Sequence, residues 1–129
     1  MLMVRQLVLK LQSRPGVLAQ VVDALGRAGV DIEGFCAPET IGRGKMRLLV
    51  SDVPKAEAAL QAAKIRCERE EAISVPLKNR PGALAEAAQK LAQAKVNIKC
   101  AYATMGGEGS ATVILTVSNL PKAVAALAC

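Results

Sequence analysis

The chain has 129 residues, enough for one ordinary domain or two very small ones, and 52% of them are hydrophobic, which is sufficient for a core. Histidine and tryptophan are absent, which excludes histidine general-base catalysis and histidine metal sites. The net charge of +6 comes from 17 basic and 11 acidic side chains. These are dispersed without a basic block, and aromatic residues are scarce, so we expect no nucleic-acid partner.

The sequence shows no targeting or membrane segment. No apolar run has the length of a membrane span, and Arg5 interrupts the apolar start too early for a signal-peptide core. We therefore expect a cytoplasmic protein without a membrane partner. The four cysteines lie far apart and form no CxxC pair, which predicts reduced, buried thiols and neither metal nor cofactor.

In chain order, the first half begins with a strand over Gln6–Gln12, where leucines alternate with other residues. Arg14-Pro15-Gly16 predicts a turn, and apolar residues at helical spacing then predict a helix from Val17 to Ala28. Two strands joined by a glycine-containing hairpin follow. A second helix is predicted after Asp52 as N-cap, and a short strand over Ile65–Arg69 ends this half.

The second half repeats the first. Ser13–Ile32 matches Asn79–Ile98 with nine of twenty positions identical, and Val50–Leu60 matches Val117–Leu127 with eight of eleven identical. Each repeat therefore has the order β-α-β-β-α-β, the split βαβ arrangement. After the second helix of the second repeat, with Asn119 as its N-cap, the sequence contains no final strand.

The predicted fold class is α+β: two ferredoxin-like βαββαβ units in tandem, with antiparallel sheets side by side and helices on one face. We place the repeats at residues 1–69 and 70–129. Without its last strand, the second repeat leaves its first strand at a sheet edge, and Pro76 in that strand fits an edge because it lacks a backbone donor.

The motif Lys78-Asn79-Arg80-Pro81-Gly82-Ala83-Leu84, followed by Val96-Asn97-Ile98 at the start of the next strand, resembles the ACT domain, a small regulatory module that binds amino acids. It is especially similar to the serine-sensing ACT domain of phosphoglycerate dehydrogenase. The first repeat has the looser version Ser13-Arg14-Pro15-Gly16-Val17-Leu18 with Val30-Asp31-Ile32. The chain is therefore identified as a tandem ACT domain protein.

This resemblance implies two unequal amino-acid sites at the boundary between the repeats. One site pairs the second-repeat turn with Asp31, and the other pairs the first-repeat turn with Asn97. The turns comprise Asn79, Arg80, Pro81, Gly82, Ala83 and Leu84 in the second repeat and Ser13, Gly16, Val17 and Leu18 in the first. A free amino acid needs donors and acceptors close together, and an asparagine amide offers both.

Other interpretations of these residues remain open. A strand-to-helix turn of this composition is also a stable connection without a ligand, in which Asn79 only caps the turn. Leu18 and Leu84 lie in apolar helical patterns, which favours a place in the core.

We therefore predict a non-catalytic regulatory protein that binds a small amino acid or related metabolite and signals its occupancy to a partner, such as a metabolic enzyme. The alternative is an accessory subunit that docks on an enzyme without binding a ligand itself. An enzyme is disfavoured because the motifs contain neither a nucleophile beside a base nor paired carboxylates. A homodimer is expected, because a small core and edge strands both gain from association.

Overall fold

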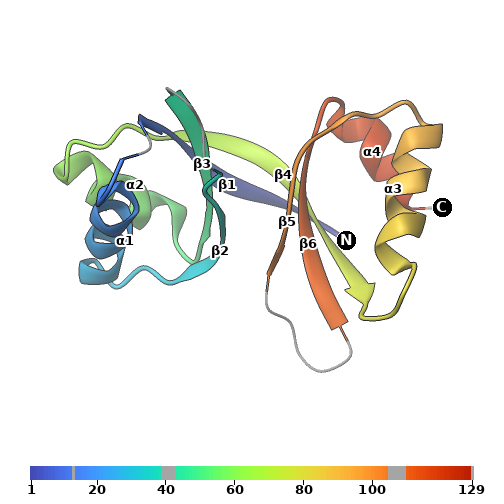
Figure 1. Ribbon diagram of the computed structural model, residues 1–129, viewed down its shortest axis with the longest axis horizontal. Helices are drawn as coiled ribbons and strands as arrows, with labels where there is room; N and C mark the ends of the chain where they lie inside the picture. Colours follow the sequence, from blue (N-terminus) through green and yellow to red (C-terminus); the bar gives the residue numbers. More distant parts are fainter. Residues whose placement is uncertain (13, 39–42, 105–109, 129) are drawn as a thin grey trace. The chain divides into compact units, whose positions relative to one another are not determined.

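The computed structural model describes residues 1–12, 14–38, 43–104 and 110–128 (Figure 1). This part of the chain forms six strands and four helices in the order β-α-β-β-α-β-α-β-β-α. Their bounds are β1 Leu2–Gln12, α1 Val17–Arg27, β2 Ile32–Cys36, β3 Arg43–Val50, α2 Val53–Ala62, β4 Glu68–Lys78, α3 Ala83–Gln93, β5 Ile98–Thr104, β6 Ser110–Val117 and α4 Leu120–Leu127. The predicted α+β class is confirmed, and so is the order of elements except that one strand, β4, stands where two were predicted. The hairpin tips were expected at Gly42-Arg43-Gly44 and at 106–109; residues 42 and 106–109 lie outside the described residues, whereas Arg43 and Gly44 already belong to β3 and are not part of a tip.

The contacts within the chain divide it into two compact units. The first unit is Arg5–Glu70, and the second unit combines Met1–Val4 with Glu71–Cys129. Strands β1 and β4 therefore each contribute residues to both units. The boundary predicted between the repeats, after residue 69, stays a prediction.

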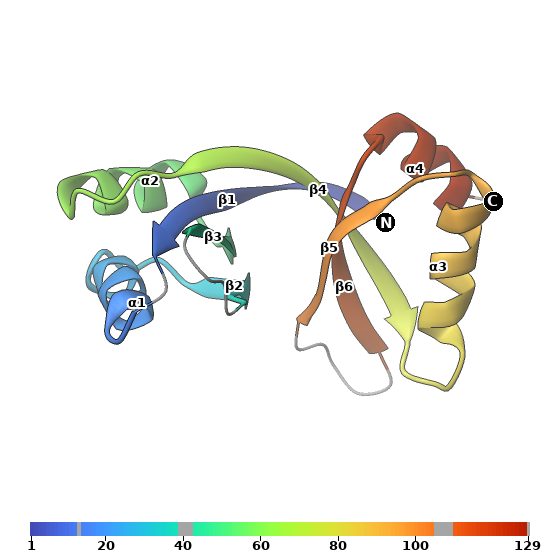
Figure 2. The same cartoon turned by 45° about the horizontal axis from the view of Figure 1, so that its top comes forward.

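In the first unit, β1 pairs with β3 and β3 with β2, all antiparallel, and the start of β4 follows β1 in the strand order. Helices α1 and α2 pack against each other over one face of these strands (Figures 1 and 2). Between sheet and helices lies a core whose fully buried members are Leu7, Leu9, Val21, Leu25, Leu48, Ala56 and Leu60. Two of these, Leu7 and Leu9, come from β1, whose leucines alternate as the sequence pattern predicts.

In the second unit, β4 pairs with β6 and β6 with β5, again antiparallel. Helices α3 and α4 cover one face (Figure 2), and the core includes Ile73, Val75, Leu91, Val96, Val113, Leu115 and Ala123. No strand follows α4 in the part of the chain that the structure describes. The start of β1 belongs to this unit and is next to β4 in the strand order, where a ferredoxin-like unit has its last strand.

Two expectations about β4 are therefore wrong. Its strand order neighbours are β1 and β6, so Pro76 does not lie in an edge strand; it is in register with Thr112 of β6. The separate strands predicted at Ile65–Arg69 and from Ile73 are one continuous strand that begins at Glu68. Glu70, one of the polar residues between them, fits in a strand because its carboxylate accepts hydrogen bonds from Gln6 in β1 and from Arg47 in β3.

The helix starts follow the sequence closely. The side chains of Asp52 and Asn119 each accept a hydrogen bond from the backbone N–H three residues later, both at 3.1 Å, so both predicted N-caps are confirmed. Helices α1 and α3 instead begin after Gly16 and Gly82, whose φ angles of 89° and 91° are left-handed. The Pro-Gly turn thus ends each strand and redirects the chain into a helix.

Candidate functional site

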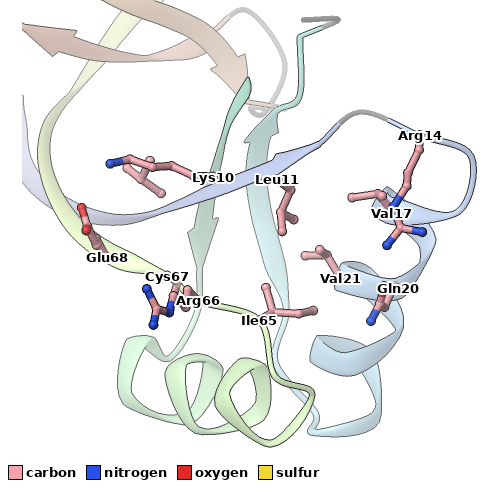
Figure 3. Close-up of a pocket in the computed structure, with 11 residues that line it drawn as sticks. Lys10, Leu11, Arg14, Val17, Gln20, Val21, Ile65, Arg66, Cys67 and Glu68 are labelled. Atoms are coloured by element: carbon pink, nitrogen blue, oxygen red, sulfur yellow. The ribbon is translucent and has the colours of Figure 1, made fainter. Parts of the chain in front are cut away.

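A pocket of about 590 Å³ lies within the first unit (Figure 3). Its wall comes from the end of β1, the first turns of α1, and the segment between α2 and β4. The lining residues are Val8, Lys10, Leu11, Arg14, Val17, Gln20, Val21, Ile65, Arg66, Cys67 and Glu68. Its volume is in the range of small-molecule sites.

The floor of the pocket is aliphatic. Val8, Val17, Val21 and Ile65 are all buried, with at most 9% of each residue exposed. Val17 and Val21 are four residues apart in α1 and therefore lie on the same face of that helix. A rigid apolar floor of this kind is suited to the hydrocarbon part of a ligand.

The rim of the pocket is charged. Lys10, Arg14 and Arg66 carry positive charges, and Glu68 carries the one carboxylate among the lining residues. None of these four side chains makes an ion pair with another described residue, whereas Arg27, Arg47, Arg69 and Arg80 are all paired. The excess of positive charge at the pocket favours an anionic ligand.

Cys67 is half-buried in the pocket wall. Burial and the negative charge of Glu57 raise the pKa of its thiol, and Arg69 opposes this only in part. The thiol is therefore protonated at neutral pH, which is the wrong state for a nucleophile or a metal ligand. The described residues contain no group of three or more acidic or cysteine side chains placed to hold a metal ion.

Of the predicted first-repeat residues, the structure brings Val17 into this pocket. Gly16 is the N-cap of α1 and does not line the pocket. Asp31 is exposed immediately before β2, where its backbone N–H donates to Ser51 Oγ at 3.0 Å. Ser13 lies outside the described residues.

The predicted second-repeat residues form the turn between β4 and α3. Asn79, Pro81 and Gly82 are exposed, and Ala83 is buried as the first residue of α3. Arg80 is held within the turn: its Nη2 donates to both carboxylate oxygens of Glu86, at 3.1 and 3.0 Å.

Asn97 immediately precedes β5, and its backbone N–H donates to Ser118 Oγ at 3.0 Å, as Asp31 does to Ser51. The two predicted contact residues thus have equivalent places in the two units. The pairings predicted across the units, of Asp31 and Asn97 with the opposite turns, stay predictions.

Leu18 and Leu84 are not in the core, contrary to expectation. Leu18 is 41% and Leu84 54% exposed. The buried face of α1 carries Val17, Val21 and Leu25. A residue one position further is turned by about 100° around the helix axis, so Leu18 falls outside that face.

Sequence reasoning missed most of the pocket's polar residues, namely Lys10, Arg14, Gln20, Arg66 and Glu68. One signal was available. Arg14 and Arg80 are identical between the repeats, whereas Gln20 replaces the acidic Glu86. Arg80 therefore forms an ion pair with Glu86 in the second unit, whereas the uncharged Gln20 cannot form one with Arg14 in the first unit.

The comparisons with known proteins agree with this architecture. The family model described as "ACT domain pair" matches residues 2–126. Each helix in the described part of the chain is too short or too polar to cross a bilayer. No curated protein matches the sequence.

Several solved structures share the fold. The protein BT0572 from Bacteroides thetaiotaomicron is 27% identical, with a TM-score of 0.88, over 98% of this chain and 87% of that one. The ligand-free regulatory subunit of aspartate kinase from Thermus thermophilus is 23% identical, with a TM-score of 0.69, over 96% and 88% of the two chains. The regulatory subunit of aspartate kinase from Thermus flavus is 19% identical, with a TM-score of 0.64, over 98% and 90%.

Proposed function

Since this chain belongs to the ACT domain pair family, we propose that it is a non-catalytic regulatory protein that binds a small amino acid and passes its occupancy to a partner enzyme. The observation that carries the proposal is the pocket of the first unit, with its aliphatic floor and unpaired charges. Two structural relatives are described as regulatory subunits of an enzyme, which supports the same kind of role.

The pocket offers a partner for each part of an amino acid. Lys10, Arg14 and Arg66 supply donors for a carboxylate, and charge-assisted hydrogen bonds of this type are the strong ones. Glu68 accepts from an ammonium group. The floor at Val17 and Val21 contacts the hydrocarbon part of the side chain.

The second-repeat turn and Asp31 belong to the proposal as further ligand contacts. Asn79 and Asp31 have exposed side chains, so both are available to a ligand. They are tested by substitution, independently of the pocket.

Signalling requires that the amino acid bind one state of the protein more tightly than another, because a ligand with equal affinity for both states shifts neither. The states differ in conformation or in assembly with the partner enzyme or a second copy of this chain. Catalysis has no part in this role, and the protonated Cys67 thiol agrees with that.

Calorimetric titration with the proteinogenic L-amino acids tests the proposal. We expect a saturable heat for one small group of amino acids, weakened at least about tenfold in Lys10→Gln, because a hydrogen bond to a charged group contributes roughly 1.5–3 kcal/mol. Asn79→Ala and Asp31→Ala then show whether the second-repeat turn and Asp31 contribute to binding. If a folded sample gave no heat of binding with any of the amino acids, this result would contradict the proposed function.

A second function, an accessory subunit that docks on an enzyme without a ligand, is favoured by one observation. Large apolar side chains are exposed at Leu2, Phe35 and Leu84, at 69%, 55% and 54%. Each of these side chains is available for burial against a partner chain. Capture of a metabolic enzyme by the wild-type chain in the absence of amino acids, lost in Phe35→Ser, would support docking over sensing.

A further inference from the structure

The two units differ at one pair of equivalent residues beside the turn. In the second unit, the guanidinium of Arg80 is neutralised by both carboxylate oxygens of Glu86. In the first unit, the residues equivalent to Arg80 and Glu86 are Arg14 and Gln20. Arg14 makes no ion pair with another described residue, and both side chains line the pocket.

Other lining residues also differ between the repeats. Lys10 corresponds to Pro76, and the valines Val17 and Val21 correspond to Ala83 and Ala87. Lys10 and the larger aliphatic side chains of Val17 and Val21 therefore occur only in the first repeat. The first repeat therefore has more positive charge and more apolar surface beside its turn than the second repeat has.

The polar groups of the pocket lie at two ends (Figure 3). Arg14 and Gln20 are on the side of α1, Lys10, Arg66 and Glu68 are on the opposite side, and the aliphatic side chains of Leu11, Val21 and Ile65 lie between them. A pocket with this distribution fits a ligand that is charged at both ends and has methylene groups in the middle.

We propose that this pocket binds an acidic amino acid, one with a carboxylate at each end. Lys10 and Arg66 hold the α-carboxylate and Glu68 accepts from the α-ammonium. Arg14, with the Gln20 amide as second donor, holds the carboxylate of the side chain. This inference rests on the proposed function and specifies its ligand class.

Charge complementarity supports this class. At neutral pH an acidic amino acid carries two carboxylates and one ammonium, and the pocket offers three basic side chains and one carboxylate. The planar guanidinium of Arg14 forms paired hydrogen bonds with a carboxylate, which a single ammonium donor does not provide. An amino acid with a purely aliphatic side chain leaves Arg14 without a partner.

Calorimetric titration with matched probes tests the ligand class. L-Glutamate and L-norvaline have the same number of carbons and differ in the distal carboxylate, whereas glutarate retains both carboxylates and lacks the ammonium. We expect L-glutamate to bind at least about tenfold more tightly than L-norvaline and glutarate, the effect of one charge-assisted contact. Equal affinity for L-glutamate and L-norvaline would overturn the inference.

The role of Arg14 is tested by reproducing the second unit's ion pair in the first. Gln20→Glu places a carboxylate where Glu86 stands in the second unit, and Arg14→Gln removes the charge itself. Both variants are expected to weaken L-glutamate about tenfold and to leave L-norvaline unchanged. The matched control Gln89→Glu makes the same exchange at an exposed residue of α3 outside the pocket and the predicted turns, and it is expected to leave both affinities unchanged.

Each remaining outcome is decisive. Equal weakening of both probes, or unchanged L-glutamate affinity in Gln20→Glu and Arg14→Gln, would overturn the assignment of Arg14. Saturable binding of another amino acid with no heat from L-glutamate or L-aspartate overturns the acidic ligand class and leaves the proposed function intact. Absence of heat for every amino acid contradicts the proposed function as well.

Discussion

At the scale of single residues, Gly16 and Gly82 have identical structural roles. Both start a helix with a left-handed backbone, at φ of 89° and 91°. A Cβ on Gly16 would meet nothing within 4 Å, and one on Gly82 would meet only the end of the Arg80 side chain at 3.9 Å. Glycine is therefore required at these two positions because the backbone is left-handed there, and not because a Cβ would lack room.

We expect Gly16→Ala and Gly82→Ala each to lower the free energy of unfolding by about 1 kcal/mol, because alanine disfavours the left-handed region. Urea unfolding measures this change. Gly26→Ala is the matched control: Gly26 lies within α1 with open space around it, so alanine there is expected to raise stability by up to about 1 kcal/mol. If all three variants shifted stability in the same direction, this explanation would be wrong.

At the scale of elements, one carboxylate links three strands of the first unit. Glu70 in β4 accepts hydrogen bonds from Gln6 in β1 and from Arg47 in β3, both at 2.8 Å. Gln6 is fully buried, and the Arg47 side chain is only 11% exposed. These contacts explain why the polar start of β4 continues the strand that the sequence pattern interrupts.

The same carboxylate predicts a pH dependence of stability. Burial raises the pKa of Glu70, but its hydrogen bonds with Arg47 and Gln6 and nearby positive charges outweigh burial and lower the pKa below 4.5 overall. A carboxyl whose pKa is lower in the folded state stabilises the fold above its unfolded pKa, and this contribution is lost as the pH falls through the folded pKa. Stability therefore declines as the pH falls below about 4.5.

The measurement is urea unfolding between neutral pH and about pH 3. Glu70→Gln is expected to cost about 1.5 kcal/mol at neutral pH, the contribution of a hydrogen bond to a charged group, and to flatten the decline at acid pH. Glu71→Gln is the control, since Glu71 is the exposed neighbour and has no ion pair with another described residue. If the stability of Glu70→Gln declined at acid pH as steeply as that of the wild-type chain, other carboxylates would be responsible for the decline.

At the scale of the whole molecule, the beginning of the chain completes the unit formed by its second half. Met1–Val4 belongs to the second unit, and β1 is next to β4 in the strand order. Leu2 and Met3 are 69% and 59% exposed, so this segment contributes through backbone pairing more than through buried side chains.

Deletion of Leu2–Val4 tests this role. We expect backbone amides of Glu71–Lys78 to exchange with deuterium roughly tenfold faster, equivalent to about 1.4 kcal/mol of local stability, while β3 in the first unit keeps its protection. The double substitution Leu2→Lys and Met3→Lys retains the backbone and is expected to keep normal exchange. Unchanged exchange after the deletion would show that β4 does not depend on this segment.

The sequence by itself determined the two repeats, the order of elements apart from the single strand β4, and the residues that start the helices. These features are local: leucine alternation in β1, Pro-Gly turns, and capping by Asp52 and Asn119 act over a few residues. Tertiary structure alone decided that Met1–Val4 completes the second unit, that Glu68–Lys78 is one strand, and that Leu18 is exposed. It also assembled the pocket, because residues far apart in the chain, such as Arg14 and Glu68, meet only after β1, α1 and the start of β4 have packed.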